Sequence, residues 1–250
     1  MTLTITPLPG LPMVAPGDDL AELLCAALDR AGILPAEGDV IVVAQKIVSK
    51  AEGQFRRLAD IAPTDAAVRI AEQTRKDPRL VQAILDESVA VVRSRPGVLI
   101  VRHRLGFVLA QAGIDQSNID HGEETVLLLP KDPDGSAAAL RSALAERLGT
   151  APAIVIADSF GRPFRNGVTG TAIGSAGVVA HVDRRGETDL FGRVLQVSTI
   201  AHADEIAAAA SLVMGQAAEG IPAAHLRGQI IAGPGKAADL IRDPETDLFA

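Results

Sequence analysis

The stretch Ala153–Gly177, AIVIADSFGRPFRNGVTGTAIGSAG, does most to decide the fold of this chain. Its first five residues form an apolar run, which predicts a buried strand. Asp158 and Ser159 follow at once, so a carboxylate and a hydroxyl come at the end of that strand. Strand ends are where α/β enzymes often place functional side chains. Two arginines, Arg162 and Arg165, and a glycine-rich run complete the stretch.

These residue types allow two interpretations. A carboxylate, a hydroxyl, two guanidinium groups and a glycine-rich backbone suit a site that holds Mg²⁺ and phosphate oxygens. The alternative is a glycine-rich turn in which Asp158 caps a helix. A second segment, Ala112–Asn118, offers Asp115 and Asn118 three residues apart. That pair suits a divalent cation and a sugar or phosphate contact, but the same residues also build ordinary turns.

The elements expected around this stretch do not alternate regularly. We therefore predict an α+β fold with mixed sheets packed against helices rather than a doubly wound sheet. One part would comprise residues 1–64 and 191–250 and carry the nucleotide contacts, and an inserted part, 65–190, would carry the metal-site aspartates. Strands are expected at 2–8, 39–44, 89–92, 98–101, 105–109 and 153–157, and helices at 20–30, 65–75, 78–85, 136–148 and 202–218.

Composition narrows the function classes without selecting one. The chain has 250 residues, 48% of them hydrophobic, with no Trp and no Tyr, so its core must be aliphatic. A net charge of −7 argues against a nucleic-acid partner. The single cysteine, Cys25, excludes an intrachain disulfide. Neither a signal sequence nor a membrane-spanning apolar run is visible, so we expect a cytoplasmic protein without a membrane partner.

Common site signatures are missing. The nearest run to a P-loop, Gly233–Lys236, is followed by Ala237 and lacks the upstream glycine. The five histidines lack zinc-hydrolase spacing. Ser159 lacks the G-x-S-x-G context of a serine nucleophile.

Five segments in order resemble the coenzyme F420-0:L-glutamate ligase family, the γ-glutamyl ligases of deazaflavin cofactor maturation. They cover nearly the whole chain: Gly10–Pro12, Val43–Gly53, Gly113–Asn118, Asp158–Arg165 and Met214–Gly220. The resemblance implies a family-specific ligase fold, neither P-loop nor ATP-grasp. It also implies a homodimer that uses GTP to join L-glutamate to the phospholactyl carboxylate of F420-0 through an acyl phosphate.

The resemblance also assigns residues. Asp115 and Asp158 match metal-binding aspartates that share one Mg²⁺ or Mn²⁺, and Ser159 and Gln216 match a second divalent site; K⁺ is a further candidate. Residues expected to contact GTP are Leu11, Pro12, Met13, Val14, Gln45, Lys46, Lys50, Asn118, Met214, Gly215, Gln216, Ala217, Ala218, Glu219, Gly220 and Ile221.

We add Arg162 and Arg165 to the candidate site because guanidinium groups bind phosphate, and we expect them to hold the acyl phosphate or the phospholactyl phosphate. The alternative is that they form a surface ion pair. Two other functions stay open at this point: a ligase of the same mechanism for another acid or amino acid, and a nucleotide-binding regulatory protein.

Overall fold

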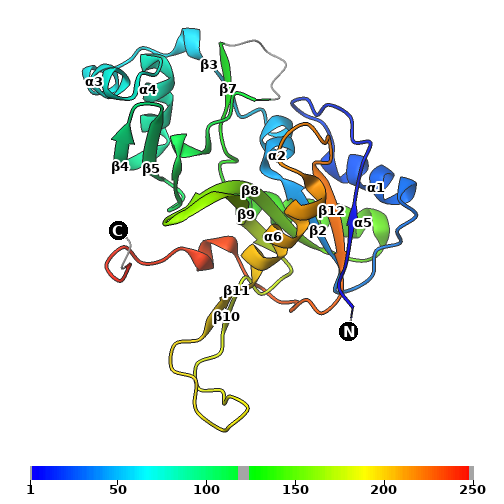
Figure 1. The fold of residues 1–250 in the computed structure, drawn as a ribbon. Helices are drawn as coiled ribbons and strands as arrows, with labels where there is room; N and C mark the ends of the chain where they lie inside the picture. Colours follow the sequence, from blue (N-terminus) through cyan, green and yellow to red (C-terminus); the bar gives the residue numbers. More distant parts are fainter. Residues whose placement is uncertain (1, 118–123, 248–250) are drawn as a thin grey trace.

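The computed structural model describes residues 2–117 and 124–247, and its fold is α+β, as predicted. A five-stranded sheet lies at its centre (Figure 1), in the order β1 (Thr4–Pro7), β12 (Ala223–Arg227), β2 (Val40–Ala44), β8 (Ala153–Arg162) and β9 (Arg165–Ala176). β2 and β8 run parallel, and the other neighbours are antiparallel.

Both faces of this sheet are buried because successive side chains of a strand point to opposite faces. In β8, Ile154 and Ile156 enter one core cluster and Val155 enters the other. The first cluster lies under α1 (Leu20–Arg30), α2 (Gln45–Ala51) and α5 (Pro133–Leu148). The second lies under α6 (His202–Met214) and the 3₁₀ turn η3 (Ala237–Leu240). This double cover explains why the two central strands read as continuous apolar runs.

A second group of elements builds its own core beside the sheet (Figure 1). It contains α3 (Asp65–Thr74), α4 (Pro78–Asp86), the 3₁₀ turns η1 (Leu58–Asp60) and η2 (Gln111–Gly113), and the antiparallel sheet of β4 (Ser88–Arg95), β5 (Val98–His103) and β6 (Val108–Ala110). The pair β3 (Phe55–Arg57) and β7 (Thr125–Leu127) connects this group to the central body.

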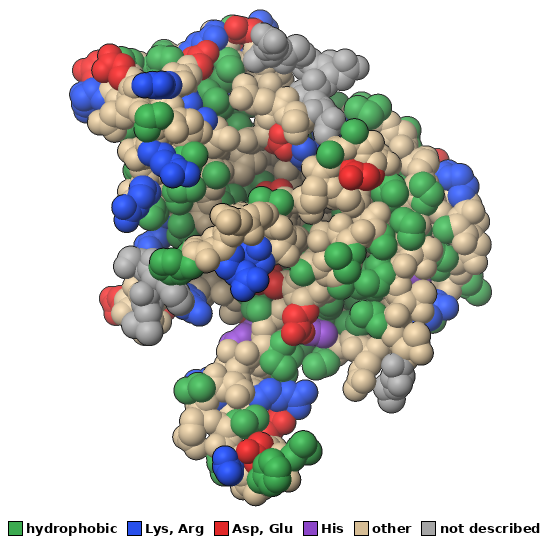
Figure 2. All heavy atoms as spheres, viewed as in Figure 1, with side chains coloured by type: hydrophobic (Ala, Val, Ile, Leu, Met, Phe, Trp, Pro, Cys, Tyr) green, Lys and Arg blue, Asp and Glu red, His purple; other side chains and the backbone are tan. Residues whose placement is uncertain are grey.

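A long hairpin arm projects from the body on β10 (His181–Asp183) and β11 (Thr199–Ala201) (Figure 1). Figure 2 shows apolar side chains near its tip, and four large apolar residues of the arm are more than half exposed: Leu190, Phe191, Val194 and Val197.

Several boundaries differ from the predictions. The glycine-rich run is not a turn but the long strand β9, so Asp158 caps no helix and instead lies within β8. The helix expected to reach Ala218 ends at Met214, because Gly215 adopts φ 76°. α5 begins at Pro133, capped by Asp132 rather than Ser136.

The division into two parts stays a prediction; β8 and β9, from the expected middle part, pair in the same sheet as β1, β2 and β12. Among the described residues, no helix is both long and apolar enough to cross a membrane.

Candidate functional site

The candidate site is a cleft of about 380 Å³ at the end of β2, where the chain turns directly into α2. Its walls come from the N-terminal segment, α2, β8 and the loop that follows α6. The cleft is lined by every predicted GTP-contacting residue that the structure describes: Leu11, Pro12, Met13, Val14, Gln45, Lys46, Lys50, Met214, Gly215, Gln216, Ala217, Ala218, Glu219, Gly220 and Ile221. Asn118 lies outside the described residues.

The sheet register explains why Asp158 and Ser159 reach this cleft. The last residue pair of the parallel ladder is Ala44 with Ala157, and β2 ends there. β8 continues for five more residues beside β9 alone. Asp158 and Ser159 therefore lie where a neighbouring strand has ended, and both line the cleft.

Asp115 comes from a different part of the chain. It follows the 3₁₀ turn η2, and its backbone exchanges two hydrogen bonds of 2.9 Å with Leu127. Lys46 Nζ lies 2.7 Å from Asp115 Oδ2 and 2.9 Å from Ser117 Oγ. The other carboxylate oxygen, Asp115 Oδ1, accepts hydrogen bonds from Ser117 N and Oγ. Asp115 and Lys46 are thus fixed against each other across 69 residues of sequence.

The two aspartates influence each other electrostatically. Burial raises the pKa of Asp115, but the hydrogen bonds from Lys46 and Ser117 outweigh burial and hold this pKa below its usual value. The pKa of Asp158 is raised to about 6, mainly by burial and in smaller part by the negative charge of Asp115, while a backbone hydrogen bond of Ser159 and the charge of Lys46 oppose the increase. The site therefore concentrates two carboxylates around one ammonium group.

This arrangement fits a divalent cation. Within residues 2–117 and 124–247, no group of three or more Asp, Glu, His or Cys side chains converges on one point. An ion here would have two carboxylates and would complete its shell with neutral oxygens, water and phosphate, as Mg²⁺ commonly does. Burial is the largest cause of the raised pKa of Asp158, and a bound cation would favour the charged form of this carboxyl group.

Ser159 and Gln216 are in direct contact. Ser159 Oγ donates a 2.5 Å hydrogen bond to Gln216 Oε1, which ties β8 to the loop after α6. Glu219 closes the same loop by accepting a hydrogen bond from Ala217 N. A Cβ on Gly215 would lie 2.2 Å from Glu219 Cδ, so this turn requires glycine both for its positive φ and for space.

Two lysines and a glutamine of α2 complete the cleft. Gln45 and Lys50 are almost fully buried, which is unusual for such residues outside a site or a hydrogen-bonded pair. Gln45 Oε1 accepts a hydrogen bond from Ser49 Oγ at 2.9 Å. The Gln45 side chain is therefore held in place from within the helix.

Arg162 and Arg165 do not line this cleft. They pair in register at the exposed tip of the β8–β9 hairpin. Arg162 lines a separate hollow beside the arm, together with Phe160 and Asp204. Among the described residues, neither arginine forms an ion pair with the other groups of the site.

The sequence assigned no role to Ser117, whose hydroxyl group in the structure accepts a hydrogen bond from Lys46 and donates one to Asp115. Its position two residues after an aspartate was the available signal, because Asp-x-Ser segments form turns closed by the carboxylate. Pro222 and Ser211 also line the cleft without a sequence signal.

Comparison with known proteins agrees with the resemblance found in the sequence. The family model described as F420-0:Gamma-glutamyl ligase matches residues 10–228. The protein named Coenzyme F420:L-glutamate ligase of Methanothermobacter thermautotrophicus is 47% identical over 252 residues, covering 100% of this chain and 99% of that protein. Those of Methanopyrus kandleri and Archaeoglobus fulgidus are 46% and 43% identical and cover 99% and 100% of this chain and 98% and 97% of their own length. The chain therefore belongs to the F420-0:gamma-glutamyl ligase family, a family of ligase enzymes.

Proposed function

We propose that this protein joins L-glutamate to the phospholactyl carboxylate of coenzyme F420-0 and uses GTP to activate that carboxylate. The observation that carries the proposal is the pair Asp115 and Asp158 beside a cleft that is lined by the residues expected to contact GTP. The names of the relatives support the acid and amine substrates.

The proposed reaction has two steps. A carboxylate oxygen of F420-0 takes the γ-phosphoryl group of GTP, which forms an acyl phosphate and releases GDP. The glutamate nitrogen then attacks the acyl carbon, the bond to phosphate breaks, and the amine loses a proton as the amide forms. Activation is needed because a free carboxylate has no good leaving group, and the protein contributes positioning and charge neutralisation.

Lys46 and Lys50 supply positive charge to this acidic protein at the cleft. Lys50 is a buried point charge, which suits a triphosphate. Lys46 faces Asp115 and Ser117, so it neutralises the aspartate pair on one side. Asp115 and Asp158 would hold one Mg²⁺ or Mn²⁺, which supplies charge neutralisation at the phosphates when bound.

Ser159 and Gln216 are the proposed protein ligands of a second divalent ion, with K⁺ as a further candidate for the site. Their hydrogen bond supports the proposal because it brings two neutral oxygens from distant segments to one point. Arg162 and Arg165 remain proposed phosphate clamps, and from the hairpin tip they would serve the acid substrate rather than GTP.

We further propose a homodimer. The arm exposes Leu190, Phe191 and Val197, with 100%, 85% and 84% of their surface in contact with solvent. Large apolar residues gathered on a projecting element are typical of a surface that a partner covers. Sedimentation analysis of the wild type and of an arm variant, Phe191→Ser, measures the oligomeric state; a monomeric wild type would refute the dimer.

The test of the reaction is a mass-spectrometric assay with F420-0, L-glutamate, GTP and Mn²⁺. We expect a mass gain of one or more glutamyl residues with matching GDP release. Asp158→Ala should abolish product with little change in fold, whereas Asp60→Ala, at an exposed aspartate that does not line the cleft, should not. Full activity of Asp158→Ala with added Mn²⁺ would refute the role of the aspartate, and no product with a wild type that binds GTP would refute the acid substrate.

A further inference from the structure

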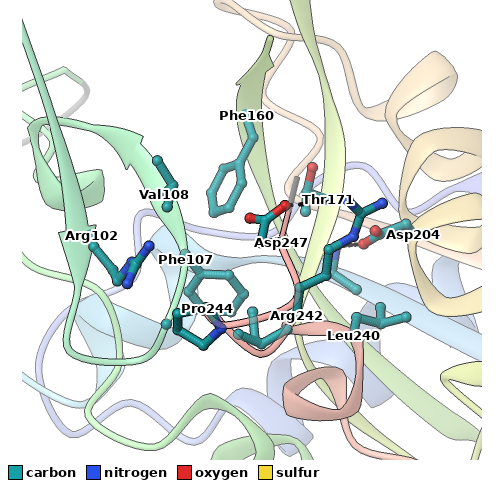
Figure 3. A pocket seen from close by; sticks show the side chains of 13 residues that line it. Arg102, Phe107, Val108, Phe160, Thr171, Asp204, Leu240, Arg242, Pro244 and Asp247 are labelled. Atoms are coloured by element: carbon teal, nitrogen blue, oxygen red, sulfur yellow. Dashed lines mark hydrogen bonds and ion pairs between the residues drawn. The ribbon is translucent and has the colours of Figure 1, made fainter. Parts of the chain in front are cut away.

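A second cavity, of about 410 Å³, lies between the β5–β6 hairpin, the strands β8 and β9, and the C-terminal segment 240–247 (Figure 3). Its lining is mostly apolar, contributed by Phe107, Val108, Phe160, Leu240, Ile241 and Pro244. The site described above uses none of these residues.

An aromatic pair forms the inner wall of this cavity. The rings of Phe107 and Phe160 pack edge to face, with centroids 5.6 Å apart and an interplanar angle of 77°. Both are under 10% exposed and belong to the central core, so they form a fixed surface. An aromatic wall of this kind favours a planar ring system, because aromatic side chains bind rings by stacked or edge contacts.

Charged groups stand at the rim. Arg102 is half-buried on β5 and forms no ion pair with any other residue that the structure describes. Its neighbours on the strand, Leu99 and Val101, face the core of the second group, so strand alternation turns Arg102 to the opposite face. Figure 3 shows its guanidinium group directed toward the hollow. Opposite, Arg242 pairs with Asp247 at 3.3 Å. The cavity thus combines an aromatic wall with a cation at its edge.

Two short segments of chain connect the cavity lining to the two aspartates. Phe160 is two residues beyond Asp158 on β8, a separation of roughly 7 Å along a strand. Val108 begins β6, which leads through η2 to Asp115 seven residues later. A ligand whose ring lies against Phe160 therefore needs only a short arm to reach the aspartates.

We propose that this cavity binds the deazaflavin ring of the acid substrate, with Arg102 beside its anionic arm and the C-terminal segment as its outer wall. The inference rests on the proposed function, because it places the acid substrate of that reaction. A planar heteroaromatic ring with an anionic chain matches both the aromatic wall and the rim cation, and the chain runs along β8 toward Asp158.

Equilibrium dialysis of F420-0 against the protein without nucleotide tests the proposal. The chain has no Trp and no Tyr, so ligand absorbance is read with little contribution from protein. Val108→Phe fills the cavity from a residue that is 46% exposed, and Val91→Phe on β4, 41% exposed, is its control outside the cavity. Arg102→Met removes the rim cation, and Arg93→Met, exposed on β4, is the matched control.

We expect Val108→Phe and Arg102→Met each to weaken F420-0 binding by about tenfold or more, the loss of one good contact, while both controls and GTP binding stay at wild-type levels. If the wild type binds F420-0 and both cavity variants bind it equally well, the cavity is not the ring site and the proposed function still stands. If the wild type binds GTP but not F420-0, both the inference and the proposed acid substrate are wrong.

Discussion

Asp39 offers the sharpest test of how this fold is held together, because it is a buried charge that contacts an arginine and a histidine. It is 1% exposed and lies directly before β2, and both partners lie on the neighbouring strand β12. Asp39 Oδ2 lies 2.8 Å from His225 Nε2 and 2.6 Å from Arg227 Nη2, and it also accepts from Ala36 N. The substitution Asp39→Asn keeps the shape of this side chain and removes its negative charge.

The magnitude follows from the pKa of Asp39. Burial alone raises this pKa, but the hydrogen bonds from Arg227, Ala36 and His225 prevail and lower it from 3.8 to about 2. At 1.36 kcal/mol per pKa unit, that difference corresponds to roughly 2.5 kcal/mol of stability at neutral pH. Asn also leaves its partners less well satisfied, so we expect a loss of about 3 kcal/mol, near the lower end for breaking a buried ion pair.

The pH dependence has a definite sign. The folded-state pKa is depressed, so the charged Asp39 stabilises the protein fully above about pH 4, its unfolded-state pKa, and this contribution falls as the pH drops toward 2. The stability difference between wild type and Asp39→Asn should therefore be largest at pH 7 and shrink below pH 4. Other acidic groups titrate in the same range, but they are common to both proteins and cancel in the difference.

Urea unfolding at several pH values measures this difference. Far-ultraviolet circular dichroism is the suitable signal, since the chain lacks Trp and Tyr. Asp60→Asn, at an exposed position, is the control and should match the wild type throughout. A difference below 1 kcal/mol at pH 7, or one that does not change between pH 7 and pH 3, would refute the reasoning.

Three further outcomes are expected. Lys50→Ala should raise the GTP concentration needed for half-maximal rate more than the glutamate concentration, and the reverse result would move Lys50 to the amine site. Ser159→Ala should raise the Mn²⁺ requirement while GTP still binds, and an unchanged metal titration would remove Ser159 from the metal ligands. Gly170→Ala should cost about 1–3 kcal/mol in urea unfolding, because the new Cβ would lie 2.4 Å from Ala207 O in α6. Gly161→Ala, in the same hairpin with open space around it, should cost under 1 kcal/mol; equal losses would show that packing against α6 is not the cause.

The central strands could be predicted because their signal is local. Val40–Ala44 and Ala153–Ala157 are apolar without interruption, as expected for strands covered on both faces. β12, with the sequence AAHLR, has two alanines, a histidine and an arginine, and gave no strand signal. Its identity depends on pairing with β1 and β2, which a local pattern does not contain.

The strand β9 was not predicted, because glycine has two structural uses. A turn needs glycine for positive φ, and the sequence left open a glycine-rich phosphate site or such a turn. In β9, Gly170 and Gly174 instead make room for neighbouring backbone: a Cβ at Gly174 would lie 2.3 Å from Pro133 O, at the start of α5. Glycine in a strand often marks such a close approach.

The difference between local and long-range signals also applies to the site. Residues adjacent in sequence, such as Asp158 and Ser159, were predictable as a unit, whereas the contact of Lys46 with Asp115 joins segments 69 residues apart and depends on the fold. Only the resemblance to a family grouped these segments in advance; the structure brings residues of four of them to one cleft, and Asp115 of the remaining segment contacts Lys46 there.

The strand β8 explains why one short sequence carries so much of the chemistry. Up to Ala157 it lies between β2 and β9, and its side chains serve only the two cores. Beyond Ala157, β2 has ended and β9 alone supports the strand, so Asp158 and Ser159 open onto the candidate cleft and Phe160 onto the second cavity. A strand that extends past the end of its neighbour holds its side chains in place and leaves one of its edges open. We therefore expect that shortening the β8–β9 hairpin from its tip as far as Val168 leaves the aspartates in place and weakens binding of the acid substrate. Phe160 lies closer to the tip than Asp158, so Phe160 loses support from β9 first.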